Sequence, residues 1–299
     1  MPIVSVVIPT YNRSETISTA IDSVLDQNFQ DFNIIVVDDG SKDRTQSVVS
    51  QYTEVDLYSF NRNRGQAAAR QKGVKEAEGE YISFLDSDDE LCPNHLSKAV
   101  EYLNETDSNC VGAFTAFKYA DSGRISHVPD NKITFDDVRS GHIIGGYSQH
   151  TYRSDVFNHI KITRDIGAAT GYDLSLRLLK KGYSMIGINE PLVRKYNSEN
   201  SISSDPERLI NGHKKIIELH GKDLTNKAIA QLYYSEAHAL VNDKKIDQAN
   251  RKFKDSLVTY PWNPRYLLYY LASAMGYRAF QSIQRLKEVV WDNIRTYNV

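Results

Sequence analysis

The first ninety residues alternate short apolar runs with amphipathic segments. The runs are rich in valine and isoleucine and cover residues 3–8, 32–37, 55–60 and 81–85. Uninterrupted runs of this length are typical of strands buried on both faces of a parallel sheet. Helical spacing follows Asn12 and recurs over 64–77, and Asn12 with Glu15 favours a capped helix start after Asn12. The pattern predicts right-handed strand–helix–strand units and an α/β fold with a mainly parallel central sheet.

The pattern is less regular in the middle of the chain and purely helical at its end. The middle is predicted to hold a turn at 121–123, a loop at 141–146, a helix at 172–181, and strands at 111–119, 183–188 and 191–196. From about Asp205 only helical spacing remains, including a pair over 223–259 that is too short for a helical solenoid. We therefore expect an α/β domain over 1–204 and a helical C-terminal region over 205–299.

Composition argues against several classes of protein. Hydrophobic residues make up 40% and charged residues 25% of the chain, and the formal net charge of −2 argues against a general nucleic-acid binder. Two cysteines are too few for a disulfide framework, and no Cys/His group has zinc spacing. The N-terminus does not resemble a signal peptide, and no apolar run reaches the roughly 18 residues of a membrane span. These features predict a cytoplasmic protein.

Polar clusters follow the predicted strands. They are Thr10 to Asn12, Asp38-Asp39, Arg62 to Arg70, and Asp86 to Asp89. Parallel sheets bind their ligands at the carboxyl ends of the strands, so these clusters are expected to meet in one site. The pair Asp86 and Asp88 has the chemistry of a cation site, because Mg²⁺ and Mn²⁺ prefer carboxylate oxygens and neutralise the charge of phosphate groups. The alternative for an isolated pair of this kind is an acidic surface turn.

Three segments together resemble the family 2 glycosyltransferases of the GT-A fold. They are Val4 to Arg13, Ile35 to Ser41, and Phe84 to Asp89. The resemblance covers roughly residues 3–200 and would make 1–204 the nucleotide-sugar-binding and catalytic domain. It implies inverting transfer of a sugar from a nucleoside diphosphate sugar, often a UDP-sugar, with Mn²⁺ or Mg²⁺ bound.

The resemblance also implies roles for individual residues. Thr10 and Tyr11 would line the nucleoside pocket, Asp39 would contact the base, and Arg70 would lie nearby. Asp86 would contact the ribose and Asp88 the metal. For Asp39 the alternative is a turn-forming residue before Gly40, and for Arg70 a solvated helix arginine.

An inverting transfer also needs a general base for the acceptor hydroxyl. Asp173 resembles the acidic residue that the family places at a helix start, although the usual Glu-Asp pair is Tyr172-Asp173 here. A positioned base contributes roughly 10²–10⁴-fold in rate. Thr170 with Asp173 also matches a helix N-cap pair, so both interpretations stay open.

One departure from the family concerns the metal. Relatives often carry a histidine ligand after the last strand, whereas residues 193–200 contain none, which leaves Asn197 or Glu199 as candidates. His142, His150 and His213 are expected to be ordinary polar residues. The Gly145-Gly146 loop either borders the acceptor site or forms a simple turn.

The C-terminal segment 260–291 mixes aromatic, aliphatic and basic residues. Leu267, Leu268, Leu271 and Met275 fall on one helical face. This pattern fits peripheral association with the cytosolic face of a membrane, where lipid-linked acceptors lie, or alternatively a helical cap.

Two other functions are weaker matches to the sequence. A nucleotidyltransferase needs a Gly-rich phosphate loop with a basic residue after the first strand, and Pro9 to Asn12 is not one. A sugar-nucleotide-binding protein without transferase activity would be favoured if Asp88 or Asp173 were absent, and both are present. The sequence therefore favours transfer of a sugar to a glycan or lipid-linked acceptor.

Overall fold

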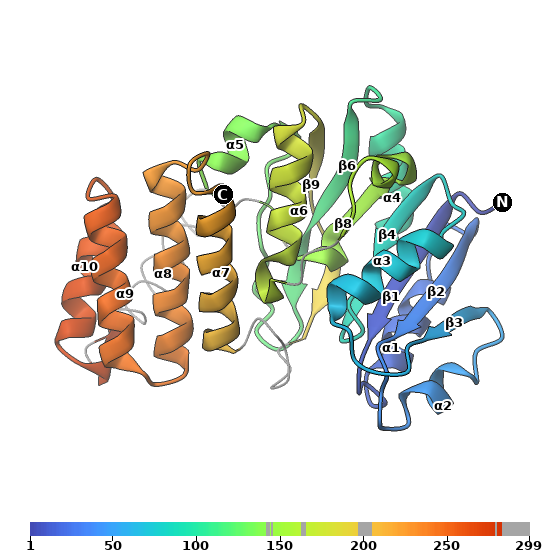
Figure 1. Ribbon diagram of the computed structural model, residues 1–299, viewed down its shortest axis with the longest axis horizontal. Helices are drawn as coiled ribbons and strands as arrows, with labels where there is room; N and C mark the ends of the chain where they lie inside the picture. Colours follow the sequence, from blue (N-terminus) through green and yellow to red (C-terminus); the bar gives the residue numbers. More distant parts are fainter. Residues whose placement is uncertain (142–143, 145, 163–165, 197–204, 279, 283–299) are drawn as a thin grey trace. The chain divides into compact units, whose positions relative to one another are not determined.

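The computed structural model describes residues 1–141, 144, 146–162, 166–196, 205–278 and 280–282. Contacts divide the chain into two compact units, Met1–Val138 with Ile143–Ser201 and Arg139–His142 with Ile202–Val299. The first unit is α/β and the second is helical within the described residues (Figure 1). That residues 1–204 form the nucleotide-sugar-binding and catalytic domain, and 205–299 a separate helical region, stays a prediction.

One sheet runs through the first unit in the order β3-β2-β1-β4-β8-β6-β9-β5, and β7 pairs with β9. Its strands are β1 (Val4–Thr10), β2 (Phe32–Asp38), β3 (Val55–Ser59), β4 (Tyr81–Phe84), β5 (Asp89–Leu91), β6 (Cys110–Tyr119), β7 (Lys132–Ile133), β8 (His150–Arg153) and β9 (Ser184–Lys195). The strands from β3 to β4 are parallel, as predicted, and β8 is antiparallel to both of its neighbours. The carboxyl ends of β1, β2 and β4 therefore share one edge of the sheet.

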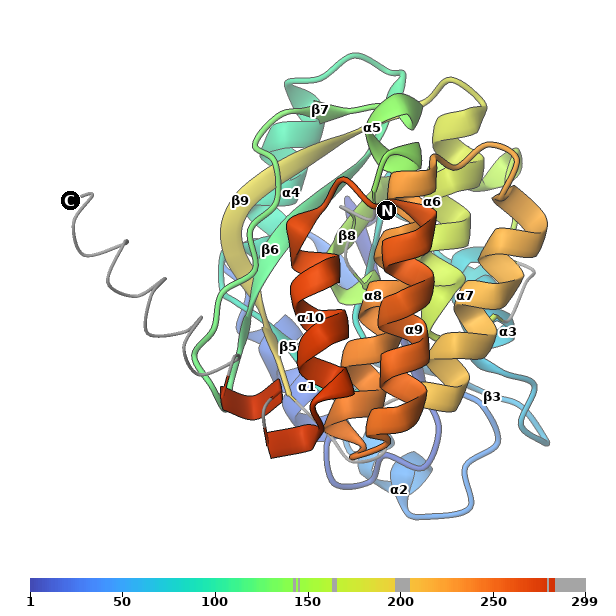
Figure 2. The ribbon, with the colours of Figure 1, turned by 90° about the vertical axis from the view of Figure 1, so that its left-hand side faces the viewer.

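Helices cover both faces of this sheet. The helices of the first unit are α1 (Ile17–Leu25), α2 (Thr45–Val49), α3 (Gln66–Glu76), α4 (His95–Asn104), α5 (Phe135–Arg139) and α6 (Thr170–Lys180). Helices α1 and α4 lie on one face and α3 and α6 on the other (Figure 2). Helix α3 approaches β1 closely, because a methyl group at Gly73 would come within 2.3 Å of the Val7 side chain.

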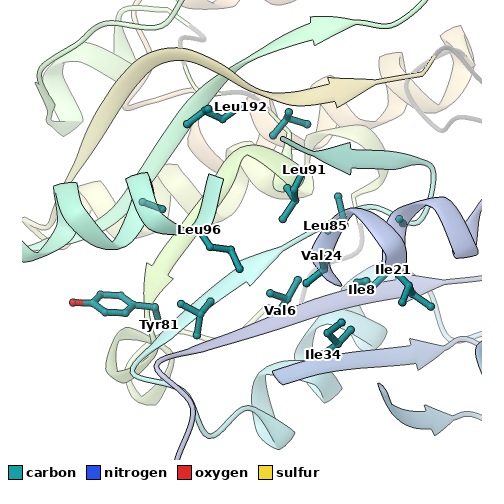
Figure 3. Close-up of a cluster of buried hydrophobic side chains, with 14 of the residues drawn as sticks. Val6, Ile8, Ile21, Val24, Ile34, Tyr81, Leu85, Leu91, Leu96 and Leu192 are labelled. Atoms are coloured by element: carbon teal, nitrogen blue, oxygen red, sulfur yellow. The ribbon is translucent and has the colours of Figure 1, made fainter. Parts of the chain in front are cut away.

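The core beneath α1 and α4 is built from the β-branched runs. Figure 3 shows valine, isoleucine and leucine side chains of β1, β2, α1 and α4 meeting in one cluster. Val6, Ile8 and Ile34 are at most 1% exposed there. Burial of side chains of this size contributes roughly 1.5–3 kcal/mol each, so the core fixes the strand ends that carry the polar clusters.

Two local expectations are wrong. The segments predicted as strands at 183–188 and 191–196 form the single strand β9, which stays paired with β6 because register shifts next to Ala116 absorb the irregularity. Helix α1 begins at Ile17, not after Asn12, and no side chain caps it. Asn12 has a positive φ of 51°, and its Oδ1 accepts a hydrogen bond from the Lys42 N–H at 2.8 Å. The asparagine therefore ties two loops together instead of capping the helix.

The second unit contains four helices among the described residues. They are α7 (Pro206–His220), α8 (Asn226–Asn242), α9 (Ile246–Thr259) and α10 (Pro264–Ala274). An aromatic cluster around Phe253 and Tyr269 packs α8, α9 and α10 together. Glu236, which is 1% exposed, accepts from Lys252 at 2.6 Å and lies 3.2 Å from His213 Nδ1. Glu236 therefore forms an ion pair with Lys252 of α9 and contacts His213 of α7 inside the unit.

None of the helices within the described part of the chain combines the length and apolar character needed to cross a bilayer.

Acid is expected to destabilise the fold through His95, the first residue of α4. The residue is fully buried, and burial lowers the pKa of its imidazole from 6.5 to about 4, against a smaller opposing effect of the Leu192 backbone. Between these pH values the unfolded chain binds a proton that the folded chain does not, so stability falls as pH falls. Lowering the pH from 7 to 5 should cost about 2 kcal/mol more in wild type than in His95→Leu. Urea unfolding at both pH values tests this, and equal losses in the two proteins would contradict it.

Candidate functional site

The ends of β1 and β2 are held together by a short hydrogen-bonded turn. The Asp39 N–H donates to the Thr10 carbonyl at 2.8 Å, and the Asn12 N–H donates to Ser41 Oγ at 2.8 Å. Gly40 has a φ of 77°, and a side chain there would lie 2.7 Å from the Arg62 backbone. Only glycine fits a position that is both left-handed and this crowded. The turn thus brings the first, second and third polar clusters together.

Asp39 is buried at this junction and organises the loop that follows β3. Its two carboxylate oxygens accept the backbone N–H groups of Arg64 at 2.7 Å and Gly65 at 2.8 Å. These two bonds fix the backbone at the start of α3 against the end of β2. The side chain therefore does more than form the turn before Gly40.

Thr10 and Tyr11 present different surfaces next to Asp39. Thr10 is 3% exposed, and among the described residues its buried hydroxyl has no hydrogen-bond partner. Tyr11 is 39% exposed. A buried hydroxyl without a partner beside an exposed aromatic ring suits a site that is completed by a polar ligand.

The ion pair between buried Arg70 and half-buried Asp86 connects α3 with the end of β4. Arg70 Nη2 lies 2.5 Å from Asp86 Oδ1, and its guanidinium stacks 4.0 Å from the centre of the Tyr147 ring. Burial raises the pKa of Asp86, but the positive charges of Arg70 and Lys195 outweigh it, so the pKa lies below its ordinary value. Arg70 is only 2% exposed, so the alternative of a solvated helix arginine is wrong.

Asp88 lies close to Arg13, the residue that directly follows the polar cluster Thr10 to Asn12. Its Oδ2 lies 3.6 Å from Arg13 Nη2, and its side chain is 17% exposed. The carboxylate oxygens available here are the donor chemistry that Mg²⁺ or Mn²⁺ prefers. Within the described ranges no group of three or more His, Cys, Asp or Glu side chains could hold a metal, and Asn197 and Glu199 lie outside them. One or two carboxylates fit a cation that takes its other ligands from phosphate and water.

A second layer of contacts, which sequence reasoning missed, fixes the turn that carries Asp86 and Asp88. Ser148 Oγ accepts the Asp86 N–H at 3.1 Å and donates to Asp89 Oδ2 at 2.6 Å. Lys195 Nζ, at the end of β9, lies 3.2 Å from the same Asp89 oxygen. Burial raises the pKa of Asp89 to about 6, with Asp86 and Asp88 adding to the rise, while Lys195 and Ser148 oppose it. A lone serine and a lone lysine carry no motif, so only the fold reveals their role.

Asp173 lies in the first turn of α6 and is fully buried. Its Oδ2 accepts from Arg177 Nε at 2.8 Å, one helical turn later. No side chain caps α6, and Thr170 instead donates to the Gly167 carbonyl, so the N-cap interpretation of Thr170 with Asp173 is wrong. The Tyr147 hydroxyl reaches the Thr170 carbonyl at 3.5 Å, which links the start of α6 to the Arg70–Asp86 pair.

The histidines and the Gly145-Gly146 loop are the remaining residues that the sequence analysis singled out. His150 is buried, with Nδ1 2.9 Å from the Gly146 carbonyl and its ring stacked on Tyr152. His213 contacts Glu236 within the second unit. His142 and Gly145 lie outside the described residues, so neither a role for His142 nor the border formed by Gly145 with Gly146 is tested.

Loss of the Arg70 charge should destabilise the protein. Arg70→Met leaves the Asp86 carboxylate without its nearest countercharge. Breaking a fully buried pair costs roughly 3–5 kcal/mol, and the 28% exposure of the Asp86 side chain makes the loss smaller here. The double variant Arg70→Met/Asp86→Asn should recover at least half of this loss, because no carboxylate remains to be compensated. Urea unfolding of both variants measures the difference. A double variant no more stable than Arg70→Met would refute the proposed compensation.

Comparison with known proteins supports one family. A sequence profile described as glycosyl transferase family 2 matches residues 5–163. A putative teichuronic acid biosynthesis glycosyltransferase, TuaG of Bacillus subtilis, is 34% identical over 217 residues, which cover 68% of this chain and 82% of TuaG. A Campylobacter jejuni GalNAc(5)-diNAcBac-PP-undecaprenol beta-1,3-glucosyltransferase is 41% identical over 110 residues, which cover 35% of this chain and 36% of that relative.

Solved structures support the fold. Residues 1–349 of Staphylococcus aureus TarS superpose with a TM-score of 0.60 at 19% identity, covering 95% of this chain and 92% of TarS 1–349. The mannosyltransferase PcManGT of Pyrobaculum calidifontis gives 0.61 at 19% identity, covering 95% and 84%. The first unit therefore has the GT-A fold, followed by C-terminal helices. From the profile match and the relationship to TuaG, the chain belongs to glycosyl transferase family 2.

Proposed function

We propose that this glycosyltransferase transfers a sugar from a nucleoside diphosphate sugar, preferably a UDP-sugar, to a glycan or lipid-linked acceptor with inversion at the anomeric carbon. One observation carries the donor assignment. The ends of β1, β2 and β4 meet through the contacts Thr10–Asp39, Arg13–Asp88 and Arg70–Asp86. A charged, hydrogen-bonding edge of this kind suits a nucleotide carrying two phosphates.

Individual side chains take the following parts in the proposal. Tyr11 and the Thr10 hydroxyl line the nucleoside pocket, and Asp39 receives an N–H of the base. Asp86, held by Arg70, accepts from the ribose hydroxyls. TarS has been crystallised with UDP-GlcNAc and with UDP, which supports a nucleotide sugar as the ligand of this fold.

Asp88 is proposed to hold the divalent cation. PcManGT was solved with GDP-Man and Mn²⁺, which supports metal use in this fold. A bound cation would offset the negative charge that develops on the leaving diphosphate. Arg13, 3.6 Å from Asp88, is placed to donate to a diphosphate oxygen.

Asp173 is proposed as the general base. In a single displacement the acceptor oxygen forms a bond to the anomeric carbon as the bond to the diphosphate oxygen breaks, and the hydroxyl proton passes to a carboxylate oxygen of Asp173. Arg177 orients that carboxylate in this proposal, through the hydrogen bond from its Nε to Asp173 Oδ2 at 2.8 Å. The acceptor would enter beside Tyr147, whose hydroxyl contacts the start of α6.

A donor screen tests the function as a whole. The purified protein is incubated with each common nucleotide sugar and Mn²⁺, and nucleoside diphosphate release is measured with and without acceptor. We expect release from one UDP-sugar to exceed the others, and the anomeric configuration of the product, read by NMR, to be opposite to that of the donor. Retention would refute inversion, and binding without release from any donor would favour the non-catalytic alternative.

Peripheral membrane association is proposed through α10. Leu267, Leu268 and Leu271 are 48%, 47% and 51% exposed, and Met275 is 74% exposed, while Tyr266 and Tyr269 on the other side of the helix are buried. Exposed Arg278 follows this apolar face. An apolar helical face beside positive charge favours an anionic lipid surface.

Vesicle binding tests this association without disturbing the core of the second unit. Leu268→Gln/Leu271→Gln/Met275→Gln changes only exposed positions and should lower co-sedimentation with anionic vesicles at least about tenfold. Val258→Gln, at a 72% exposed position of α9, is the matched control and should bind as wild type. Equal sedimentation of wild type and the triple variant would refute a membrane role for this face.

A further inference from the structure

The outer side of α3 carries a hollow of about 310 Å³ that none of the roles above uses. It is lined by two alanines of α3 and by Phe60, Arg64, Gln71, Lys72, Lys75 and Ile162. Three of its side chains are basic, and no carboxylate lines it among the described residues. We name it the basic hollow. Ligand pockets usually measure roughly 300–1,000 Å³, so its size suits one sugar unit rather than a long chain.

The sequence concentrates positive charge at this place. Five cations and no Asp or Glu lie between Asp56 and Glu76: Arg62, Arg64, Arg70, Lys72 and Lys75. Arg70 turns inward to Asp86, whereas Arg64, Lys72 and Lys75 face the basic hollow. The whole chain has a formal net charge of −2, so this local excess of positive charge is not a property of the composition.

Two of the three basic side chains, Arg64 and Lys75, present donors that a ligand can use, whereas Lys72 is paired with Glu76. The Arg64 guanidinium stacks over Phe60 with 4.7 Å between Cζ and the ring centre, so its face is covered and its N–H edge can donate. Lys72 lies 2.5 Å from Glu76 and above Tyr58, which fixes it at the wall of the hollow. Lys75 is exposed. A guanidinium held by stacking and an exposed ammonium beside the apolar side chains of the hollow suit a sugar that carries an acidic group.

One side of the basic hollow is formed by Ile162, and the residue before it contacts Arg177, the partner of Asp173. The Ile162 N–H donates to Gln71 Oε1 at 2.7 Å, and the preceding Lys161 carbonyl accepts from Arg177 Nη1 at 3.0 Å. Arg177 is the partner of Asp173. Two consecutive residues therefore contact the basic hollow on one side and the pair Asp173–Arg177 on the other. A ligand in the hollow would lie next to the segment that adjoins the proposed base.

We propose that the basic hollow binds an acidic group, a carboxylate or a phosphate, on a sugar unit of the acceptor. The proposal rests on the proposed function, because it assigns the acceptor class to that same enzyme. It makes the preferred acceptor an anionic glycan. The reacting hydroxyl lies on a neighbouring unit, since the hollow itself holds about one sugar.

Binding of defined oligosaccharides without donor tests this proposal. Trigalacturonate, a trimer of glycerol phosphate and neutral maltotriose are titrated into the full chain at low salt by isothermal calorimetry. At least one acidic ligand should bind about tenfold or more tightly than maltotriose, and 0.5 M salt should remove most of the difference. The acidic ligand that binds identifies the group as carboxylate or phosphate. Equal affinity for all three would overturn the proposal.

Variants locate the binding site. Arg64→Gln/Lys75→Gln should weaken the acidic ligand about tenfold, and Ala68→Glu, which places a carboxylate in the hollow, should weaken it at least as much. Lys98→Gln in α4, on the opposite face of the sheet, changes the net charge by the same amount as Ala68→Glu and should bind as wild type. Thermal unfolding of each variant excludes loss of the fold, and Ala68→Glu serves if the double variant is unstable. Unchanged affinity in a folded hollow variant would overturn the proposal.

A separate donor titration distinguishes failure of the proposed function from failure of the proposed role of the basic hollow. Failure to bind any nucleotide sugar, with the acidic trimer still bound, would reject the proposed function and retain an anion site. Binding of a nucleotide sugar without preference for an acidic trimer would reject the basic hollow alone.

Discussion

Asp88→Asn is expected to lower the rate of nucleoside diphosphate release by at least about a hundredfold at saturating Mn²⁺. Asparagine keeps the size of the side chain but removes the negative charge that attracts a cation to this turn. It also removes the partner of Arg13, 3.6 Å away, but that pair is partly exposed and contributes little to stability. The variant should therefore unfold at nearly the wild-type temperature while needing far more Mn²⁺ to reach half of its own maximal rate.

Glu90→Gln is the matched control for this experiment. Glu90 lies two residues after Asp88, and its carboxylate faces Arg194 at 3.1 Å and the Tyr196 hydroxyl instead of the predicted cation. It should retain wild-type metal dependence. Calorimetric titration of Mn²⁺ in the presence of UDP provides a readout that is independent of turnover. Near wild-type turnover of Asp88→Asn in metal-free buffer would rule out Asp88 as the metal ligand.

Much of the first unit could be predicted from the sequence, because burial on both faces of a parallel sheet leaves uninterrupted β-branched runs. The runs at 3–8 and 32–37 became β1 and β2, and polar residues at their ends met at one edge. The motif around Asp86 to Asp89 was visible for the same reason, since it directly follows a buried strand. Local pattern and global topology agree here.

The rest of the site depends on contacts between distant segments, which no local pattern encodes. Ser148 and Lys195 reach Asp89 only because β8 and β9 fold back into the sheet. Asn12 matched a helix cap, yet its side chain bonds the loop after β2, so a tertiary contact replaced the local one. The two strands expected after residue 183 form one strand, because bulges beside Ala116 let β6 follow the whole length of β9.

Thr170 and Asp173 show the same limit within one helix. Their spacing matches a cap, but the structure uses Thr170 to close the preceding turn and pairs Asp173 with Arg177. A cap would have given the carboxylate a structural reason to be there. The structural role that the contacts show is the ion pair with Arg177, and catalysis is the second role that we propose for this fully buried carboxylate.

Asp173→Asn is expected to lower the rate of sugar transfer by about 10²–10⁴-fold, the usual contribution of a positioned base. Asparagine has the same shape but cannot take the proton of the acceptor hydroxyl. The change also deprives Arg177 of its carboxylate partner, 2.8 Å away, so some loss of stability accompanies it. Donor affinity should stay close to wild type, because Asp173 is assigned to the acceptor and not to the nucleotide.

Arg177→Met separates the base from the structural role, because it breaks the same ion pair and keeps the carboxylate. If Asp173 acts only through its pairing with Arg177, both variants should lose similar stability and similar activity. If Asp173 is the base, Asp173→Asn should be at least about tenfold slower than Arg177→Met at comparable stability. Initial rates of transfer at saturating donor and acceptor, with urea unfolding of both proteins, measure the two effects. Equal rates in the two variants would remove Asp173 from the chemistry and leave it as the buried partner of an arginine.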